Sequence, residues 1–161
     1  MVVVLIIAIL IAIAIPTFLG AKSRSQDKAA QSSLRNAVTN AKGIYTDTDS
    51  YVNVTVSALT TSEPSLAFVA AGTASADAKS VSVNAVSPAA GGTAIIMTAL
   101  STTGSCYVIG DWSLGGTFYA RLASGLTCSA SQATTTLPNV VPSPSSTSNA
   151  SITTNAWVVA W

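Results

Sequence analysis

The chain has 161 residues, of which 49% are hydrophobic and only 8% are charged. Globular domains usually contain roughly a quarter charged residues, so the 23 serines and 20 threonines must supply most of the polar surface here. The length suits one domain, and a net charge of +1 gives no electrostatic attraction to nucleic acid. The sequence has no histidine, which excludes Ser-His and Cys-His nucleophile pairs and histidine metal ligands. We therefore expect that the protein is not an enzyme and that it has no cofactor and no metal site.

The first 21 residues form an apolar segment in which no residue is charged. As a helix they would be about 32 Å long, which is enough to cross the hydrocarbon region of a bilayer. We predict a transmembrane or filament-core helix over residues 1–21. Its large apolar side chains are Val2, Val3, Val4, Leu5, Ile6, Ile7, Ile9, Leu10, Ile11, Ile13, Ile15, Phe18 and Leu19.

Two helix-weakening residues, Pro16 and Gly20, lie near the end of this segment. Proline removes a backbone hydrogen bond and clashes with the preceding turn, and glycine weakens a helix by about 1 kcal/mol. We therefore expect a kink or local unwinding between Ala12 and Gly20. A secretory signal peptide is the alternative, because Ala12-Ile13-Ala14 looks like a cleavage site, but no basic region precedes the apolar run.

The helical pattern continues through residues 22–50, which include the exit loop, but here only one stripe is apolar. We predict that this stripe packs on a sheet. Its members are Ala30, Leu34, Ala37, Val38, Ala41 and Tyr45. Five basic residues lie between them, and we interpret them as a solvated helix face rather than a surface for DNA or acidic headgroups. They are Lys22, Arg24, Lys28, Arg35 and Lys42.

Residues 51–133 show short β-like stretches separated by glycine, serine and asparagine. The predicted strands are Leu66–Val69, Val81–Val86, Ala94–Met97, Cys106–Ile109 and Thr117–Arg121. The clearest hairpin is Cys106–Arg121, with its turn at Asp111–Gly116. A four- to five-stranded antiparallel sheet packed on the helix stripe predicts an α+β fold. We interpret Tyr107, Trp112 and the neighbouring Phe118 and Tyr119 as packing and edge residues.

The two cysteines, Cys106 and Cys128, enclose 21 residues. A disulfide between them would stabilise the fold by roughly 3 kcal/mol and would persist only in an oxidising compartment. Two buried free thiols are the alternative. Asn53 and Asn149 each begin an N-glycosylation triplet, although a chain rich in serine and threonine produces such triplets by chance. We place the domain outside the cell.

The basic flank at Lys22, Arg24 and Lys28 conflicts with this orientation, because the positive-inside rule would place it in the cytoplasm. The conflict disappears if a basic leader preceded Met1 and was removed after it had set the orientation.

The last predicted unit, residues 134–161, is a tail rich in serine, threonine and proline that ends in an apolar segment. The part from Thr134 to Asn149 has no amphipathic period, and we expect a surface segment. The end, Ala156–Trp161, would be costly to leave in water. We predict that it adds a strand to the sheet edge or docks on a neighbouring subunit.

The run MVVVLIIAILIAIAIP, its continuation TFLGAKSRSQDKAAQSSLRNAV and the exit Tyr45-Thr46-Asp47…Tyr51 resemble the N-terminal helix of type IV pilins over about the first fifty residues. The resemblance departs at the start. Family members usually begin the mature chain with an N-methylated phenylalanine and carry a glutamate a few residues later, and both would fall before Met1.

This resemblance implies the pilin fold and a filament in which the N-terminal helices bundle. It also implies a prepilin peptidase, a platform protein and an assembly ATPase as partners, and adhesion, twitching motility or DNA uptake as outputs. The subunit would be a single-pass protein of the cytoplasmic membrane before assembly and part of an extracellular homopolymer afterwards. DNA binding has no support in the residues.

Two other functions stay open. One is a pseudopilin of a type II secretion or competence system, and the other is a membrane-anchored extracellular domain that does not polymerise. Asp47 and Asp49 fit helix termination and turn formation better than a Ca²⁺ site, because no further oxygen ligands follow in a recognisable loop.

Overall fold

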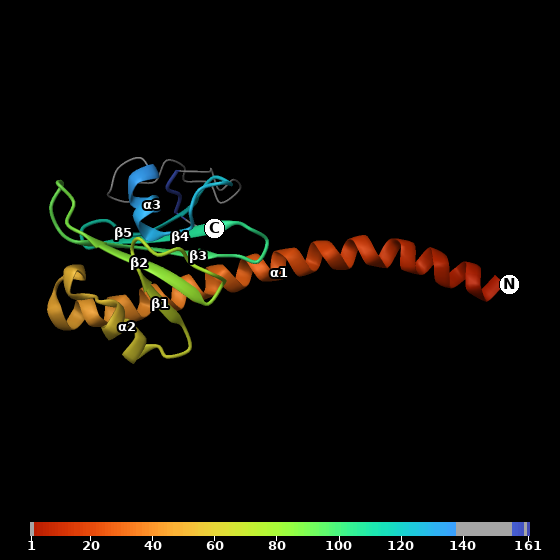
Figure 1. The fold of residues 1–161 in the computed structure, drawn as a ribbon, viewed down its shortest axis with the longest axis horizontal. Coiled ribbons are helices and arrows are strands. Elements are labelled where there is room, and N and C mark those ends of the chain that lie inside the picture. Colours follow the sequence, from red (N-terminus) through yellow and green to blue (C-terminus); the bar gives the residue numbers. More distant parts are fainter. Residues whose placement is uncertain (1, 138–155, 160) are drawn as a thin grey trace.

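The computed structural model describes residues 2–137, 156–159 and 161. It has the predicted α+β architecture, a long N-terminal helix packed on a five-stranded, mostly antiparallel sheet. Helix α1 (Val2–Thr48) projects far beyond the domain with its first half and lies against the sheet with its second half (Figure 1). This division follows the sequence, in which apolar residues on all sides give way to a single apolar stripe.

The sheet has the order β1-β2-β3-β4-β5, so each strand lies beside its neighbours in the sequence. The strands are β1 (Ala67–Ala70), β2 (Ser80–Val86), β3 (Ala94–Leu100), β4 (Cys106–Trp112) and β5 (Gly116–Arg121). One pairing differs from the prediction, because β1 and β2 run parallel. Since β1 has only four residues, the loop 71–79 is long enough to return the chain to the same end of the sheet.

The β4–β5 hairpin has a shorter turn than the sequence predicts, because β4 continues to Trp112. Asp111, predicted to lie in the turn, is instead a buried strand residue that accepts a hydrogen bond from the Tyr51 hydroxyl at 2.5 Å. The indole ring of Trp112 covers Gly115. A Cβ added at Gly115 would lie 2.4 Å from Cε3 of that ring, so a side chain there would displace the tryptophan.

Three short helices were not predicted: η1 (Tyr51–Asn53), α2 (Val56–Ser62) and α3 (Ala130–Thr136). Each begins after a hydroxyl residue whose side chain accepts a backbone N–H of the first turn, namely Ser50, Thr55 and Ser129. Such capping residues indicate helix starts in most sequences. In this chain they cannot be told apart from the other serines and threonines, because there are 43 hydroxyl residues. Helix α3 also crosses the predicted boundary between residues 133 and 134.

Both faces of the sheet are covered. One core lies between the sheet and α1, η1 and α2, and includes Leu34, Tyr51 and Met97. The second core lies on the opposite face, under α3, and includes Ile96 and Trp157. Strands buried on both faces lose the alternation of apolar and polar residues, which explains the continuous apolar sequence of β3.

The predicted helix stripe lies in the first core. Ala30, Leu34, Ala37, Val38 and Ala41 are buried there. Tyr45 is partly buried and stacks on Tyr51 with a distance of 4.6 Å between ring centroids.

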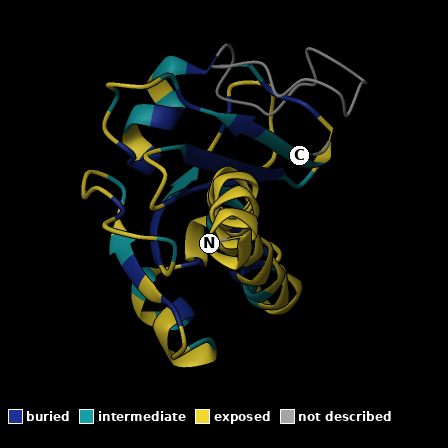
Figure 2. Cartoon of the chain, turned by 90° about the vertical axis from the view of Figure 1, so that its right-hand side faces the viewer, coloured by how far each residue is buried: buried dark blue, intermediate teal, exposed yellow. Residues whose placement is uncertain are grey.

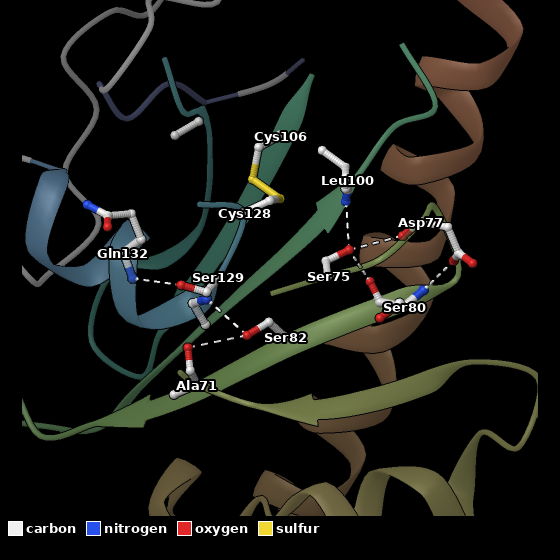
Figure 3. Close-up of a disulfide and its surroundings, with 12 residues drawn as sticks. Ala71, Ser75, Asp77, Ser80, Ser82, Leu100, Cys106, Cys128, Ser129 and Gln132 are labelled. Carbon is white, nitrogen blue, oxygen red and sulfur yellow. Dashed lines mark hydrogen bonds between the residues drawn. A yellow bond between two sulfur atoms is a disulfide. The ribbon is translucent and has the colours of Figure 1, made fainter. Parts of the chain in front are cut away.

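Cys106 and Cys128 form a disulfide with a Cα–Cα distance of 5.5 Å (Figure 3). The bond joins the start of β4 to the segment that leads into α3. Backbone hydrogen bonds hold the same segment on the loop between β1 and β2, since the Ser75 N–H donates to the Cys128 carbonyl at 2.8 Å. The Ser82 hydroxyl accepts the Ala130 N–H at 3.0 Å. The segment that leads into α3 is therefore held by the disulfide, by the Ser75 N–H and by the Ser82 hydroxyl.

Replacing both cysteines by serine should lower the free energy of unfolding by roughly 3 kcal/mol, because the open chain regains the entropy that the loop closure removes. Denaturant unfolding of the full chain in detergent measures this change. Treating the unchanged protein with a reducing agent should give the same loss. An unfolding midpoint that neither treatment moves would contradict the prediction.

The C-terminal apolar segment contacts the free edge of the sheet. Val158 forms an antiparallel bridge with Tyr119 of β5, and Trp157 is fully buried. Trp161 lies against Tyr119, with 4.6 Å between ring centroids, and the Arg35 guanidinium lies 5.4 Å from the centroid of the Trp161 ring. Of the two predicted positions for this segment, the chain uses the sheet edge. The triplet at Asn149 lies outside the described residues, and Asn53 is exposed.

Candidate functional site

The first half of α1 is an uncovered apolar surface. The thirteen large apolar side chains from Val2 to Leu19 are each between 50% and 70% exposed. In the view along the helix from its N-terminal end, this half is exposed on the sides that face the viewer (Figure 2). Soluble monomers rarely expose contiguous apolar patches larger than a few hundred Å². A surface of this kind therefore requires a partner or a lipid environment.

This half of α1 has no polar face. A helix that is apolar all round belongs in a membrane or in the interior of a protein. In α1, however, the 18 most apolar consecutive residues are not covered by the rest of the described chain. By length and composition, α1 could cross a membrane.

The helix is continuous through Pro16 and Gly20. Close to the proline, the Thr17 hydroxyl donates to the carbonyl of Ala14 at 2.9 Å and to that of Ile13 at 3.2 Å. A Cβ added at Gly20 would meet no other side chain or segment of the described chain within 4 Å. Packing within the subunit therefore does not require glycine there. The kink or unwinding predicted between Ala12 and Gly20 stays a prediction.

The second half of α1 is fixed to the domain at two places that sequence reasoning missed. At its start, Asp27 accepts hydrogen bonds from the hydroxyls of Ser101 at 2.7 Å and Thr103 at 2.5 Å. Nearer its end, Lys42 forms an ion pair with Asp111 at 2.8 Å. The signal in the sequence was faint, because Asp27 and Asp111 are each isolated acidic residues and nothing near them in the sequence indicates their distant partners. These bonds fix the direction in which the apolar half projects.

Two buried tyrosines support these attachments. Burial and the Asp111 carboxylate raise the pKa of Tyr51, so its hydroxyl keeps the proton that it donates to Asp111. Burial and the nearby Asp27 carboxylate likewise raise the pKa of Tyr107. Both hydroxyls therefore remain neutral donors across the physiological range.

The five basic residues of α1 divide into two groups. Lys42 pairs with Asp111, Arg35 contacts Trp161, and Lys28 donates to the Gln31 side chain at 2.9 Å. Lys22 and Arg24 are exposed at the junction with the apolar half. All five basic residues are exposed, as a solvated face requires, and Lys42 and Arg35 in addition contact the domain.

The end of α1 agrees with the assignment of its two aspartates to helix termination. Asp47 lies in the last turn. Asp49 has a left-handed backbone conformation, with φ of 53°, and its N–H donates to the Tyr45 carbonyl at 2.7 Å. Within the described residues, no three His, Cys, Asp or Glu side chains gather into a metal-binding group.

Comparisons with protein-family models, with curated proteins and with solved structures gave no match. The resemblance to type IV pilins therefore rests on the quoted N-terminal residues. The class that the fold defines is an α+β domain carried on a helix with an uncovered apolar half.

Proposed function

We propose that this chain is the structural subunit of an extracellular filament of the type IV pilus kind, and that it polymerises through residues 2–21 of α1. The observation that carries the proposal is the exposure of every large apolar side chain from Val2 to Leu19. The second half of the same helix is packed on the sheet, so the two halves have different tasks.

The apolar half of α1 needs a non-aqueous environment both before and after assembly. Before assembly, a single membrane span satisfies it, because the helix makes its own backbone hydrogen bonds and presents only apolar side chains to lipid. To leave the membrane, it needs an equally apolar environment, and the same half-helices of neighbouring copies supply one. Head-to-tail addition of identical subunits produces an open helical filament.

The domain has properties that suit the outside of such a filament. The Cys106–Cys128 disulfide is stable in an oxidising compartment. The weakly charged, hydroxyl-rich surface of the domain allows identical domains to pack side by side without strong mutual repulsion. These features support an extracellular location for the domain, with α1 directed toward the filament axis.

Electron microscopy of material sheared from the surface of expressing cells tests the proposal, with mass spectrometry to identify the main chain. We expect long filaments composed chiefly of this subunit. Recovery of the chain only from the membrane fraction, as a monomer, would contradict the proposal and favour an anchored domain. Short fibres that form only with an active secretion apparatus would contradict it in favour of a pseudopilin.

A further inference from the structure

The packed half of α1 carries unpartnered charges of opposite sign at its two ends. We propose that Lys22 and Arg24, here called the basic collar, pair in the filament with Asp47 and Asp49 of another copy, here called the acidic helix end. The inference rests on the proposed function, because it names a contact between copies of the proposed filament that is separate from the contact between their apolar half-helices.

The basic collar has no acidic partner within the described chain. Lys22 and Arg24 are exposed, and the one ion pair among the described residues joins Lys42 to Asp111. The nearest acidic residue in the sequence, Asp27, already accepts hydrogen bonds from two hydroxyls of the domain. The collar is therefore free to meet a carboxylate from outside the subunit.

The acidic helix end is electrostatically unfavourable within the subunit. The C-terminal end of a helix carries a partial negative charge, so basic residues stabilise it and acidic residues do not. Asp47 and Asp49 place two carboxylates there, both exposed, and the last turn of α1 contains no basic residue. Basic side chains supplied from outside would remove this unfavourable charge.

One axial shift brings the two surfaces to the same height. Lys22 and Asp47 are 25 residues apart on α1, which corresponds to about 38 Å along the helix. A parallel copy displaced by that length would place its basic collar beside the acidic helix end of the first copy. The contact is head to tail, so every copy offers one collar and one acidic end, and the contact repeats along an open filament.

Charge reversal with compensation tests the pairing. Lys22→Glu alone and Asp47→Lys alone should each reduce the yield of sheared filaments about fivefold, the size expected for one exposed charge pair. The double variant, Lys22→Glu with Asp47→Lys, should restore most of the yield. Lys79→Glu is the matched control, because Lys79 is exposed beside the start of β2 and belongs to neither surface. It should leave the yield unchanged.

A second measurement separates assembly from folding. Asp47→Lys puts a favourable charge at the end of α1, so thermal unfolding of the full chain in detergent should occur at the same or a higher temperature. A variant that is equally or more stable as a subunit and yet yields fewer filaments has lost an intersubunit contact.

The outcomes are distinguishable. If the unchanged chain forms no filaments, the proposed function fails. If it forms filaments and the single reversals leave the yield unchanged, or the double variant does not recover, the pairing is wrong while the proposed function stands. If Lys22→Glu releases the chain from the membrane and Asp47→Lys has no effect, the collar binds acidic lipid, which also overturns the pairing.

Discussion

Leu10→Asp is expected to abolish filament formation while leaving the domain folded. Leu10 lies in the middle of the uncovered half of α1 and is 61% exposed in the subunit, so the substitution breaks no contact with the domain. A charge at the centre of an apolar span costs about 2.5–3.5 kcal/mol on insertion scales. An unpaired charge inside a bundle of apolar helices is also strongly unfavourable. Both the membrane-stored and the assembled states therefore lose stability.

The measurement is the yield of filaments in the sheared fraction, relative to the total amount of the chain. Leu114→Asp is the matched control, because Leu114 is 65% exposed in the turn between β4 and β5 and carries the same chemistry on the domain surface. It should leave the yield unchanged. Normal filaments from Leu10→Asp would show that the apolar half of α1 does not hold the copies together.

A pair of leucine truncations should separate the two halves of α1. Leu34 is fully buried against the sheet, so Leu34→Ala should lower the free energy of unfolding by about 2–5 kcal/mol, as expected when a core leucine leaves a cavity. Leu19 is exposed in the subunit. Leu19→Ala should therefore change the unfolding free energy by no more than about 0.5 kcal/mol and should weaken the filament instead.

Denaturant unfolding of each full-length variant in detergent, followed through the tryptophan fluorescence of the domain, gives the first quantity. Filament yield gives the second. Equal effects of the two truncations on unfolding would mean that the apolar half is part of the folded core, contrary to its exposure in the structure.

The long helix and the β4–β5 hairpin could be predicted because their signals are local. Apolar residues on all sides up to Leu19, followed by a stripe at helical spacing from Ala30, define α1 and its two environments. The strand β3 and the position of Cys106 at the start of β4 were likewise visible in the sequence. The capped helices α2 and α3 were not, because the hydroxyl residues that begin them are common throughout this chain.

Long-range contacts account for the rest of what the sequence did not predict. The parallel pairing of β1 with β2 depends on how the loop 71–79 returns. The second core forms only when α3 and Trp157 close over the far face of the sheet. The paired residues of β1 and β2 are 13 positions apart, as for Ala67 and Ser80, and Trp157 is far from its second-core partners in the sequence. No local pattern indicates which of these residues meet.

The same difference between local signals and long-range contacts decides which parts of the candidate site could be predicted. The apolar surface could be named residue by residue, because exposure on every side follows from composition alone. The paired and unpaired charged residues could not be told apart, because the sequence does not show that Lys42 pairs with Asp111 or that Asp27 accepts hydrogen bonds from the loop after β3. Only when these partners are known do the basic collar and the acidic helix end stand out as unpaired.

A reconstruction of the sheared filaments by electron cryo-microscopy tests the central claim most directly. We expect residues 2–21 of every copy to lie in a central bundle of helices, with the side chains from Val2 to Leu19 buried and the sheet domains outside. A filament held together by its domains, with these half-helices on the outer surface, would contradict it.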